Sequence, residues 1–291
     1  MNSSLHSKVD VLMPAYNHEA YIRLAIESVL SQKTSFKYRL LIGEDCSTDN
    51  TLQICKDYAT RFPETIVLLA NNPNVGLVKN FERLYKHSNA EFLAICDGDD
   101  LWSDNEKLQK EFDVLQSTPH LVGAFHQTDV INENSDIIRK VENLPRKEFL
   151  NFEILKIPMP APSMFFKNVL GELPFEKFTS THIDVFLTNL LAKKGGFVRL
   201  EGTAVQYREH STSIFSKRNT YFQLKSKIKT RWMLLHIAES YDHKKLLYNQ
   251  VLNYSRSGLS RSIKRDFHPM WTFRFASSWL RARLRLLLLA K

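Results

Sequence analysis

Cysteine is scarce in this chain, and long apolar stretches are missing. The three cysteines, Cys46, Cys55 and Cys96, are odd in number and follow no zinc-ligand spacing. We therefore expect reduced, mostly buried thiols rather than a disulfide framework. No run of about 18 uncharged apolar residues is present, which argues against a membrane-spanning helix. Residues 1–6 lack the apolar core of a signal peptide, so we expect no secretion signal.

Acidic residues are in the minority, and the excess positive charge lies at the end of the chain. The sequence holds 40 Lys and Arg against 31 Asp and Glu, a formal net charge of +9. Residues 256–291 contain nine Lys or Arg and one acid, a local net charge of +8. The rest of the chain is nearly neutral and offers no basic groove, which argues against nucleic acid as a partner.

One acidic cluster directly follows an apolar run. Residues 92–96 are apolar, and Asp97-Gly98-Asp99-Asp100 comes immediately after them. Carboxylates this close together stay ionised where a cation or hydrogen-bond donors meet them. Mg²⁺ and Mn²⁺ on a diphosphate are held by one or two carboxylates. The cluster alone is as typical of a solvated acidic turn as of a metal–diphosphate site.

Residues 9–96 alternate between short apolar runs and segments with apolar residues at helical spacing. This alternation predicts a mostly parallel sheet covered by helices. Ligands of such sheets bind beyond the carboxyl ends of the strands, where three polar clusters would meet. The clusters are Tyr16-Asn17, Glu44-Asp45 and Asp97–Asp100. The predicted strands are residues 9–13, 39–43, 65–69 and 91–96. The predicted helices are residues 19–31, a segment that Ser47 or Thr48 caps, and residues 77–87.

Beyond residue 120 the alternation is less regular. The pattern predicts strands over 121–125 and 197–200, a helix over 184–193, a strand over 205–210 that leaves the sheet, and helical structure over 221–254. The chain therefore reads as an α/β domain followed by a helical, basic extension.

Four motifs, taken in this order, resemble those of the GT-A-fold glycosyltransferases of family 2. They are the strand and turn of residues 11–17, the acidic segment Glu44–Asp49, the turn Asn74-Val75-Gly76 and the D-x-D-like Asp97-Gly98-Asp99. The resemblance covers residues 9–110. Tyr207–His210 is similar to the YRxH ending of non-processive members that build bacterial surface polysaccharides.

The resemblance implies a GT-A fold, a Rossmann-like, mostly parallel sheet flanked by helices. It implies a catalytic domain over residues 1–215, with a nucleotide-binding half (1–115) and an acceptor half (116–215), and a helical C-terminal region over 216–291. It also implies that Asp45 reads the base, and that Lys79 faces the nucleotide, although an exposed helix lysine is an equal alternative. The other nucleotide-sugar contacts implied are Pro14, Tyr16, Asn17, Glu44, Asn74, Gly76, Asp97 and Gly98.

The resemblance further implies a cofactor, Mn²⁺ or Mg²⁺. Asp99 is the first expected metal ligand, and Asp97 contacts the metal or the ribose. His210 is either a third ligand or closes over the diphosphate together with Arg208.

Asp184 is the expected general base, because inverting transfer needs a carboxylate that takes the acceptor's proton. The alternative is that Asp184 only caps the helix it opens. Asp100 receives no role from the sequence.

The basic tail, residues 271–291, interleaves arginines with aromatic and leucine residues. This pattern favours a helix that lies in the headgroup layer of an anionic membrane. A helix packed against protein is the alternative.

Together these features predict a metal-dependent inverting glycosyltransferase at the inner face of the cell membrane, cytoplasmic and peripheral. It would move a sugar from a nucleotide-diphosphate donor, a UDP-sugar first, to a lipid-linked or polysaccharide acceptor of a cell-surface glycan such as lipopolysaccharide, O-antigen or capsule. One alternative is a sugar nucleotidyltransferase, which the lack of a Gly-rich basic loop after the first strand disfavours. The other is a catalytically silent nucleotide-sugar-binding scaffold of a membrane assembly complex.

Overall fold

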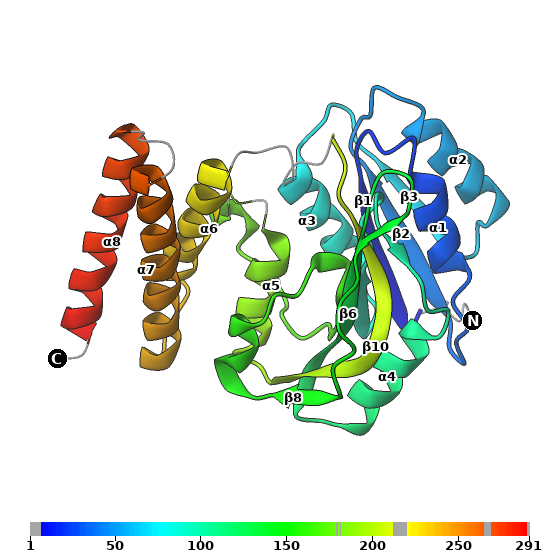
Figure 1. Ribbon diagram of the computed structural model, residues 1–291. Coiled ribbons are helices and arrows are strands. Elements are labelled where there is room, and N and C mark those ends of the chain that lie inside the picture. Colours follow the sequence, from blue (N-terminus) through cyan, green and yellow to red (C-terminus); the bar gives the residue numbers. More distant parts are fainter. Residues whose placement is uncertain (1–6, 179, 181, 212–219, 265–268, 290–291) are drawn as a thin grey trace. The chain divides into compact units, whose positions relative to one another are not determined.

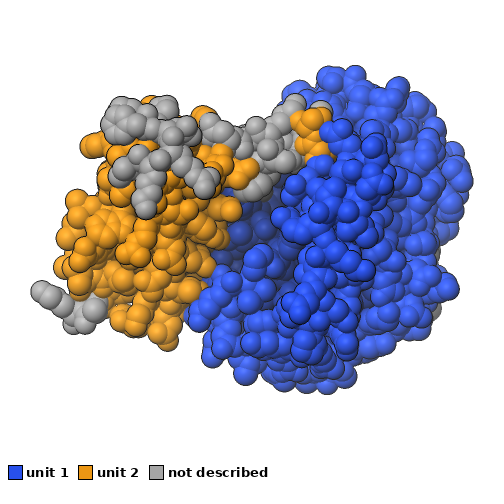
Figure 2. Space-filling view, viewed as in Figure 1, with its two compact units in different colours: residues 1–209 blue, residues 210–291 orange. Residues whose placement is uncertain are grey.

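The computed structural model describes residues 7–289 except 179, 181, 212–219 and 265–268 (Figure 1). The chain divides into two compact units, residues 1–209 and 210–291, coloured separately in Figure 2. The boundary expected at residues 215/216 falls in the segment 212–219, outside the described residues.

The first unit is built on one mixed sheet, with strand order β3-β2-β1-β4-β9-β6-β10-β5. β3, β2, β1 and β4 run parallel to one another, and β6 and β10 form a second parallel pair. β9 joins the two groups by antiparallel pairing with β4 and β6. The strands are β1 (Val9–Ala15), β2 (Tyr38–Glu44), β3 (Ile66–Ala70), β4 (Phe92–Ile95), β5 (Leu101–Trp102), β6 (Leu121–Ile131), β7 (Ile137–Arg139), β8 (Lys147–Phe149), β9 (Met164–Lys167) and β10 (Gly196–Arg208).

Helices cover both faces of this sheet (Figure 1). Alternate residues of β1, such as Val11 and Met13, share a core with α1, α2 and α4, because successive strand side chains point to opposite faces. On the other face, the ring of Phe175, which precedes α5, contacts the rings of Phe81 in α3 and Phe186 in α5. The helices are α1 (Ile22–Leu30), α2 (Thr51–Arg61), α3 (Leu77–His87), α4 (Lys107–Ser117) and α5 (Ile183–Leu191), with 3₁₀ turns η1 (Asn151–Lys156), η2 (Ala161–Ser163) and η3 (Phe175–Lys177). The predicted α/β architecture, a mostly parallel sheet flanked by helices, is confirmed.

One prediction about the second half of the sheet is wrong. The segments expected as two separate strands, 197–200 and 205–210, form the single strand β10, which stays paired with β6 as far as Arg208 and Ile131. The register shifts between Arg199 and Thr203, where Gly202 has a φ of 87°. A bulge with a glycine in this conformation absorbs extra residues without ending the strand.

The second unit consists of α6 (Thr220–Leu234), α7 (Tyr241–Lys264) and α8 (Pro269–Leu289). Its core contains Leu224 and Ile228 of α6, Val251 of α7, and Trp271 and Phe275 of α8. The basic tail, expected as a helix in the headgroup layer of a membrane, is thus a helix with one face packed inside the second unit. Over the described residues, no helix combines the length and the apolar character needed to cross a bilayer.

Candidate active site

The polar clusters that follow β1, β2 and β4 meet at one edge of the sheet. β1 lies between β2 and β4 and runs parallel to both, so the three strands end on the same side. The backbone continues this pairing past the strand ends, because Asp45 N–H donates to Ala15 O (3.0 Å) and Gly98 N–H donates to Pro14 O (3.0 Å). The sheet thus brings together segments that lie about 30 and 80 residues apart in the chain, as parallel βαβ units do.

Asn17 joins the first two of these segments. Its φ of 55° turns the chain at the end of β1. Its N–H donates to Ser47 Oγ (3.0 Å), and its Oδ1 accepts from Thr48 N–H (2.9 Å). The expectation that Ser47 or Thr48 caps the next helix is wrong, because α2 begins at Thr51 after Asn50. The two hydroxyl residues instead fix the loop around Asn17.

Asp45 organises the loop that contains the Asn74-Val75-Gly76 turn. Its carboxylate accepts from the N–H groups of Val75 (2.9 Å) and Gly76 (2.8 Å) and from Asn71 Nδ2 (2.9 Å). Asn74 Nδ2 also donates to the carbonyl of Asp45 (2.6 Å). Three donors on one buried carboxylate fix the shape of the loop. The reading of a base by Asp45 stays a prediction.

The remaining expected nucleotide contacts differ in exposure. Glu44 is fully buried; Oε1 accepts from Ser47 N–H (2.8 Å), and Oε2 has no hydrogen-bond partner among the described residues. Pro14 is buried within β1, whereas Tyr16 is 40% exposed just past the strand. Lys79 is exposed in the first turn of α3. Tyr16 and Lys79 are therefore open to a ligand from solution, and Glu44 is not.

Gly98 allows a close approach at the centre of the acidic cluster. A Cβ atom at this position would lie 2.8 Å from His18 Nδ1 and 2.8 Å from Ile22 Cδ1. His18 Nε2 lies 3.6 Å from Asp99 Oδ2. No motif marks His18 in the sequence, and its one signal is its position directly after Asn17 at the end of a strand.

Two carboxylates of the acidic loop, Asp97 and Asp99, interact with a third from a distant part of the chain, Asp184. Burial raises the pKa of Asp97 to about 8, and the charges of Asp99 and Asp184 add to this increase. Asp184 is half-buried in the first turn of α5. An effect of Asp184 on the pKa of Asp97 requires the two carboxylates to be near each other. The structure therefore unites Asp97 and Asp99 with the residue expected to act as general base.

Asp100 has a structural contact that the sequence did not reveal. It is 1% exposed, and its Oδ1 accepts from the N–H of Arg208 (2.7 Å) at the end of β10. Burial raises the pKa of Asp100 well above its usual value, as do Asp99 and Asp97, while Arg208 opposes the increase. Asp100 Oδ2 has no hydrogen-bond partner among the described residues. Asp100 thus joins the acidic loop to the far side of the sheet.

The Arg208 side chain strengthens this connection. Its Nε donates to the carbonyl of Asp99 (2.9 Å), and its Nη1 donates to Asn132 O (2.8 Å) and Ser135 Oγ (3.0 Å). The guanidinium lies 4.8 Å from the ring centre of Tyr21. Burial lowers the pKa of Arg208, but its ordinary value is so high that it stays charged. Arg208 therefore fixes the backbone of Asp99 and the β6–β7 turn together.

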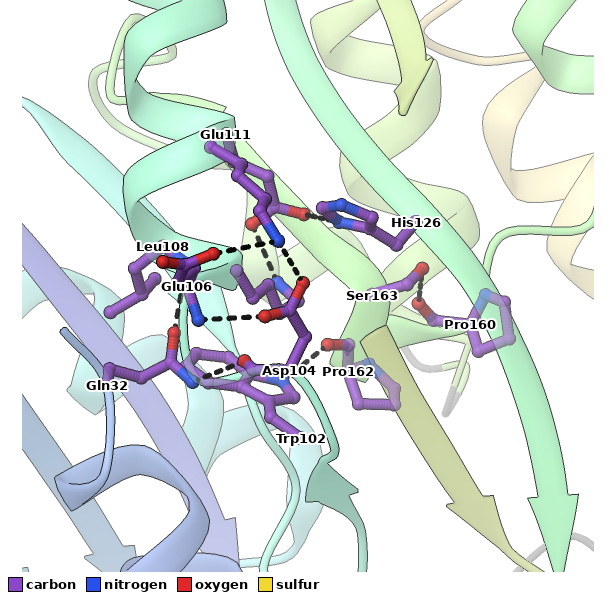
Figure 3. Close-up of polar contacts among 12 residues, drawn as sticks. Gln32, Trp102, Asp104, Glu106, Leu108, Glu111, His126, Pro160, Pro162 and Ser163 are labelled. Atoms are coloured by element: carbon purple, nitrogen blue, oxygen red, sulfur yellow. Dashed lines mark hydrogen bonds and ion pairs between the residues drawn. The ribbon is translucent and has the colours of Figure 1, made fainter. Parts of the chain in front are cut away.

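A buried network of polar contacts involves Trp102, Glu111 and His126 (Figure 3). Lys107 Nζ contacts Glu111 Oε2 at 2.7 Å, and Glu111 Oε1 lies 3.0 Å from His126 Nδ1. Lys107 Nζ also lies 4.4 Å from the ring centre of Trp102, whose Nε1 donates to Pro162 O (2.9 Å). The network connects α4, β6, β5 and η2, and its residue Trp102 follows Asp100 by two positions in the chain. No sequence pattern indicates this network, because buried ion pairs have the same composition as exposed ones.

The acidic loop fits a divalent cation that is shared with a phosphate ligand. Asp97 and Asp99 offer hard oxygen ligands, and a bound cation would oppose the increase in the pKa of Asp97 that burial and the charges of Asp99 and Asp184 cause. Among the described residues, no three His, Cys, Asp or Glu side chains form a group able to hold a metal by themselves. Proteins usually bind Mg²⁺ through one or two carboxylates, and the phosphate oxygens of the ligand complete its coordination shell. His210, the first residue of the second unit, is buried, and its role as a ligand stays a prediction.

Comparison with curated proteins finds relatives of part of the chain. The putative glycosyltransferase EpsE of Bacillus subtilis is 38% identical over 121 residues, which are 41% of this chain and 42% of EpsE. The minor teichoic acid biosynthesis protein GgaA of the same organism is 31% identical over 114 residues, 38% of this chain and 25% of GgaA. The chain spans well under half the length of the curated relatives it matches, 36–42% for the first of them.

Solved structures share the fold over a longer stretch. S. aureus TarS, residues 1–349 in complex with UDP-GlcNAc, matches 94% of this chain and 79% of that structure, with a TM-score of 0.69 and 19% identity. The fold is thus that of the GT-A glycosyltransferases. Residues 10–172, more than half of the sequence, match the sequence model of the family described as glycosyl transferase family 2. The chain therefore belongs to glycosyl transferase family 2.

Proposed function

We propose that this protein is a metal-dependent inverting glycosyltransferase that uses a nucleotide-diphosphate sugar, a UDP-sugar first. The acceptor is a hydroxyl group of a lipid-linked or polysaccharide chain in cell-surface glycan synthesis. The observation that carries the proposal is the meeting of Asp97, Asp99 and Asp184, expressed in the raised pKa of Asp97. A protein of this family with these carboxylates at the carboxyl edge of the sheet has the groups that sugar transfer requires.

The donor would bind at the edge formed by the ends of β1, β2 and β4. Asp99 and Asp97 would hold Mn²⁺ or Mg²⁺, with His210 as a further ligand. The cation, when bound, supplies Lewis-acid stabilisation of the negative charge on the leaving diphosphate. Asp45, together with the loop it fixes, would contact the base. TarS was solved with UDP and with UDP-GlcNAc, which supports a UDP-sugar as the first donor to test. The other proposed contacts are Pro14, Tyr16, Asn17, Glu44, Asn74, Gly76, Lys79 and Gly98.

Asp184 would act on the acceptor. Its carboxylate takes the proton of the acceptor hydroxyl while that oxygen bonds to the anomeric carbon of the sugar. The bond between this carbon and the diphosphate oxygen breaks at the same time, so the configuration inverts. Asp184 is suited to this task because it comes from the acceptor half of the first unit and lies near Asp97. A correctly placed general base contributes about 10²–10⁴-fold to the rate.

We also propose peripheral contact of residues 271–291 with an anionic membrane, at the cytoplasmic face. Although Trp271 and Phe275 pack inside the second unit, α8 keeps an exposed apolar stripe of Phe273, Leu280, Leu284, Leu287 and Leu288. Arginines on the same helix would reach anionic headgroups. Removing residues 271–291 and finding the protein still on phosphatidylglycerol vesicles would contradict this part of the proposal.

The main experiment measures nucleotide release from a panel of nucleotide sugars, with Mn²⁺ or with EDTA, in the presence of lipid-linked and polysaccharide acceptors. We expect Mn²⁺-dependent release of UDP from one donor by the wild-type protein and by Asp113→Asn, a control that removes an exposed carboxylate on α4. Asp99→Asn should lose the release. If every donor binds but none is turned over, the chain is the silent nucleotide-sugar-binding scaffold instead.

A further inference from the structure

The second unit contains two helices that carry charge of only one sign. α6 and α8 each hold four Lys or Arg residues and no Asp or Glu. A groove of about 340 Å³ runs between one face of α6 and one face of α8. We call this the basic groove; its main lining residues are Lys225, Lys229 and Trp232 of α6 and Arg274, Ser278 and Arg281 of α8. All of these residues belong to the second unit, so the groove does not depend on how the two units are placed.

Contacts between the helices set the width of the groove. Trp232 Nε1 donates to Ser278 Oγ (3.2 Å), which ties the two walls together. Lys225 Nζ lies 5.9 Å and Arg274 Cζ lies 5.3 Å from the ring centre of Trp271. One aromatic ring therefore orients a cation from each helix. The groove is built from defined side-chain contacts rather than from independent surface lysines.

The positive charge of the basic groove is not neutralised within the described part of the chain. The groove lining contains no carboxylate. The ion pairs found between described residues involve none of Lys225, Lys229, Arg274 and Arg281. Four exposed cations that repel one another create a field that attracts anions. A ligand with several negative charges would relieve this repulsion.

The spacing of the cations indicates the kind of anion. Lys225 and Lys229 are four residues apart, about 6 Å along the helix, and Arg274 and Arg281 are seven residues apart, about 10 Å. This length exceeds that of one phosphate group. Arg binds phosphate through two parallel hydrogen bonds, and Lys binds it as a point charge. Ile228 and Trp232 add an apolar surface on which a carbon skeleton can lie.

We propose that the basic groove binds a ligand that carries at least two phosphate groups on a carbon skeleton with an apolar face. The phosphates contact Lys229 and Arg281 across the groove, and the skeleton lies against Trp232. The site is separate from the donor site of the first unit, and its existence does not rest on the transferase reaction.

The test titrates the full chain with sodium tripolyphosphate in EDTA by isothermal calorimetry, so that no metal-bound diphosphate site takes part. We expect saturable binding to one site. Lys229→Gln with Arg281→Gln should weaken it about tenfold, because each lost exposed charge contact changes an affinity by a few-fold. The matched control, Lys245→Gln with Arg256→Gln, removes one Lys and one Arg that are exposed on α7 outside the groove lining, and should change the affinity less than twofold.

A second arm identifies the source of the phosphates. Vesicles of phosphatidylglycerol are compared with vesicles of phosphatidylcholine for both double variants. If the groove variant loses binding to phosphatidylglycerol vesicles and the control variant keeps it, the phosphates belong to a lipid surface. If the groove variant loses tripolyphosphate binding but keeps vesicle binding, the ligand is a free phosphate-bearing chain. Equal weakening by the two double variants, or no tripolyphosphate binding by the wild type, overturns the proposal. The pair Lys225→Gln with Arg274→Gln serves if the first groove variant fails to fold.

Discussion

The connection between Arg208 and the acidic loop gives a prediction whose magnitude follows from the structure. Arg208→Met keeps most of the buried aliphatic volume but removes the hydrogen bonds to Asp99 O, Asn132 O and Ser135 Oγ. Each of these partly buried acceptors costs about 1–3 kcal/mol when it loses its donor. Because removing the guanidinium also removes the cost of burying its charge, we expect a net loss of about 3 kcal/mol in the free energy of unfolding of the first unit. This loss corresponds to a melting temperature lower by about 6–12 °C.

The same substitution should affect ligand binding. Since Arg208 Nε fixes the carbonyl of Asp99, its loss frees the backbone that positions the proposed metal ligand. We expect the Mn²⁺-dependent affinity for UDP to fall about tenfold, the size of effect typical when a residue that orients a metal ligand is removed. Arg208→Lys should show an intermediate loss, because an ammonium keeps the charge but cannot reproduce the planar set of donors.

Differential scanning calorimetry suits this measurement because it separates the transitions of the two units. Asp100→Asn is the matched control, since an amide oxygen can still accept from Arg208 N–H, and its melting temperature should stay within a few degrees of wild type. UDP affinity is measured by calorimetric titration with Mn²⁺. If Arg208→Met melts like the wild type and binds UDP equally well, Arg208 does not hold the acidic loop.

Three further predictions concern buried groups of the first unit. Lys107→Met leaves the buried carboxylate of Glu111 without its cation and should lower the free energy of unfolding by about 3–5 kcal/mol. Adding Glu111→Gln should recover part of this loss. If urea unfolding shows that the losses of the two single variants simply add in the double variant, the two residues are not paired. Burial raises the pKa of Cys55 to about 12, so N-ethylmaleimide at pH 8 should label the half-buried Cys46 before Cys55. Equal labelling of Cys46 and Cys55 in mass spectrometry would be evidence against the fold. The pKa of Asp97 is about 8 in the folded state against 3.8 ordinarily, so between these pH values the folded state holds a proton that the unfolded state has lost. The free energy of unfolding of the metal-free protein should therefore fall as the pH rises from 4 through 8. An equal pH slope in Asp97→Asn would contradict this prediction.

Much of the nucleotide half was predictable because local patterns determine it. Apolar runs such as residues 9–13 alternate with helical segments, and this alternation fixes a parallel sheet with the polar strand ends on one edge. The meeting of Glu44-Asp45 with Asp97–Asp100 follows from topology alone. Exact ends did not follow, because Ser47 and Thr48 have the chemistry of helix caps but bond to Asn17 instead.

Contacts that depend on long-range packing were not predictable. The role of Asp100 depends on Arg208, which is 108 residues later in the chain and reaches it only because β10 ends beside the acidic loop. Lys107 and Glu111 have the spacing of an exposed helical ion pair, and nothing in the sequence indicates that both are fully buried. Periodicity did indicate a helix opening near Asp184, but its nearness to Asp97 emerges only from the folded chain.

The central claim is that Asp97, Asp99 and Asp184 form one site in which Asp184 acts on the acceptor while the other two hold the donor. The direct measurement compares UDP affinity with turnover for Asp184→Asn and Asp99→Asn, using the donor that the panel identifies. Asp184→Asn should bind UDP with Mn²⁺ within about threefold of wild type and lose about 10²–10⁴-fold in kcat, whereas Asp99→Asn should lose both binding and turnover. A kcat near the wild-type value in Asp184→Asn would contradict the account.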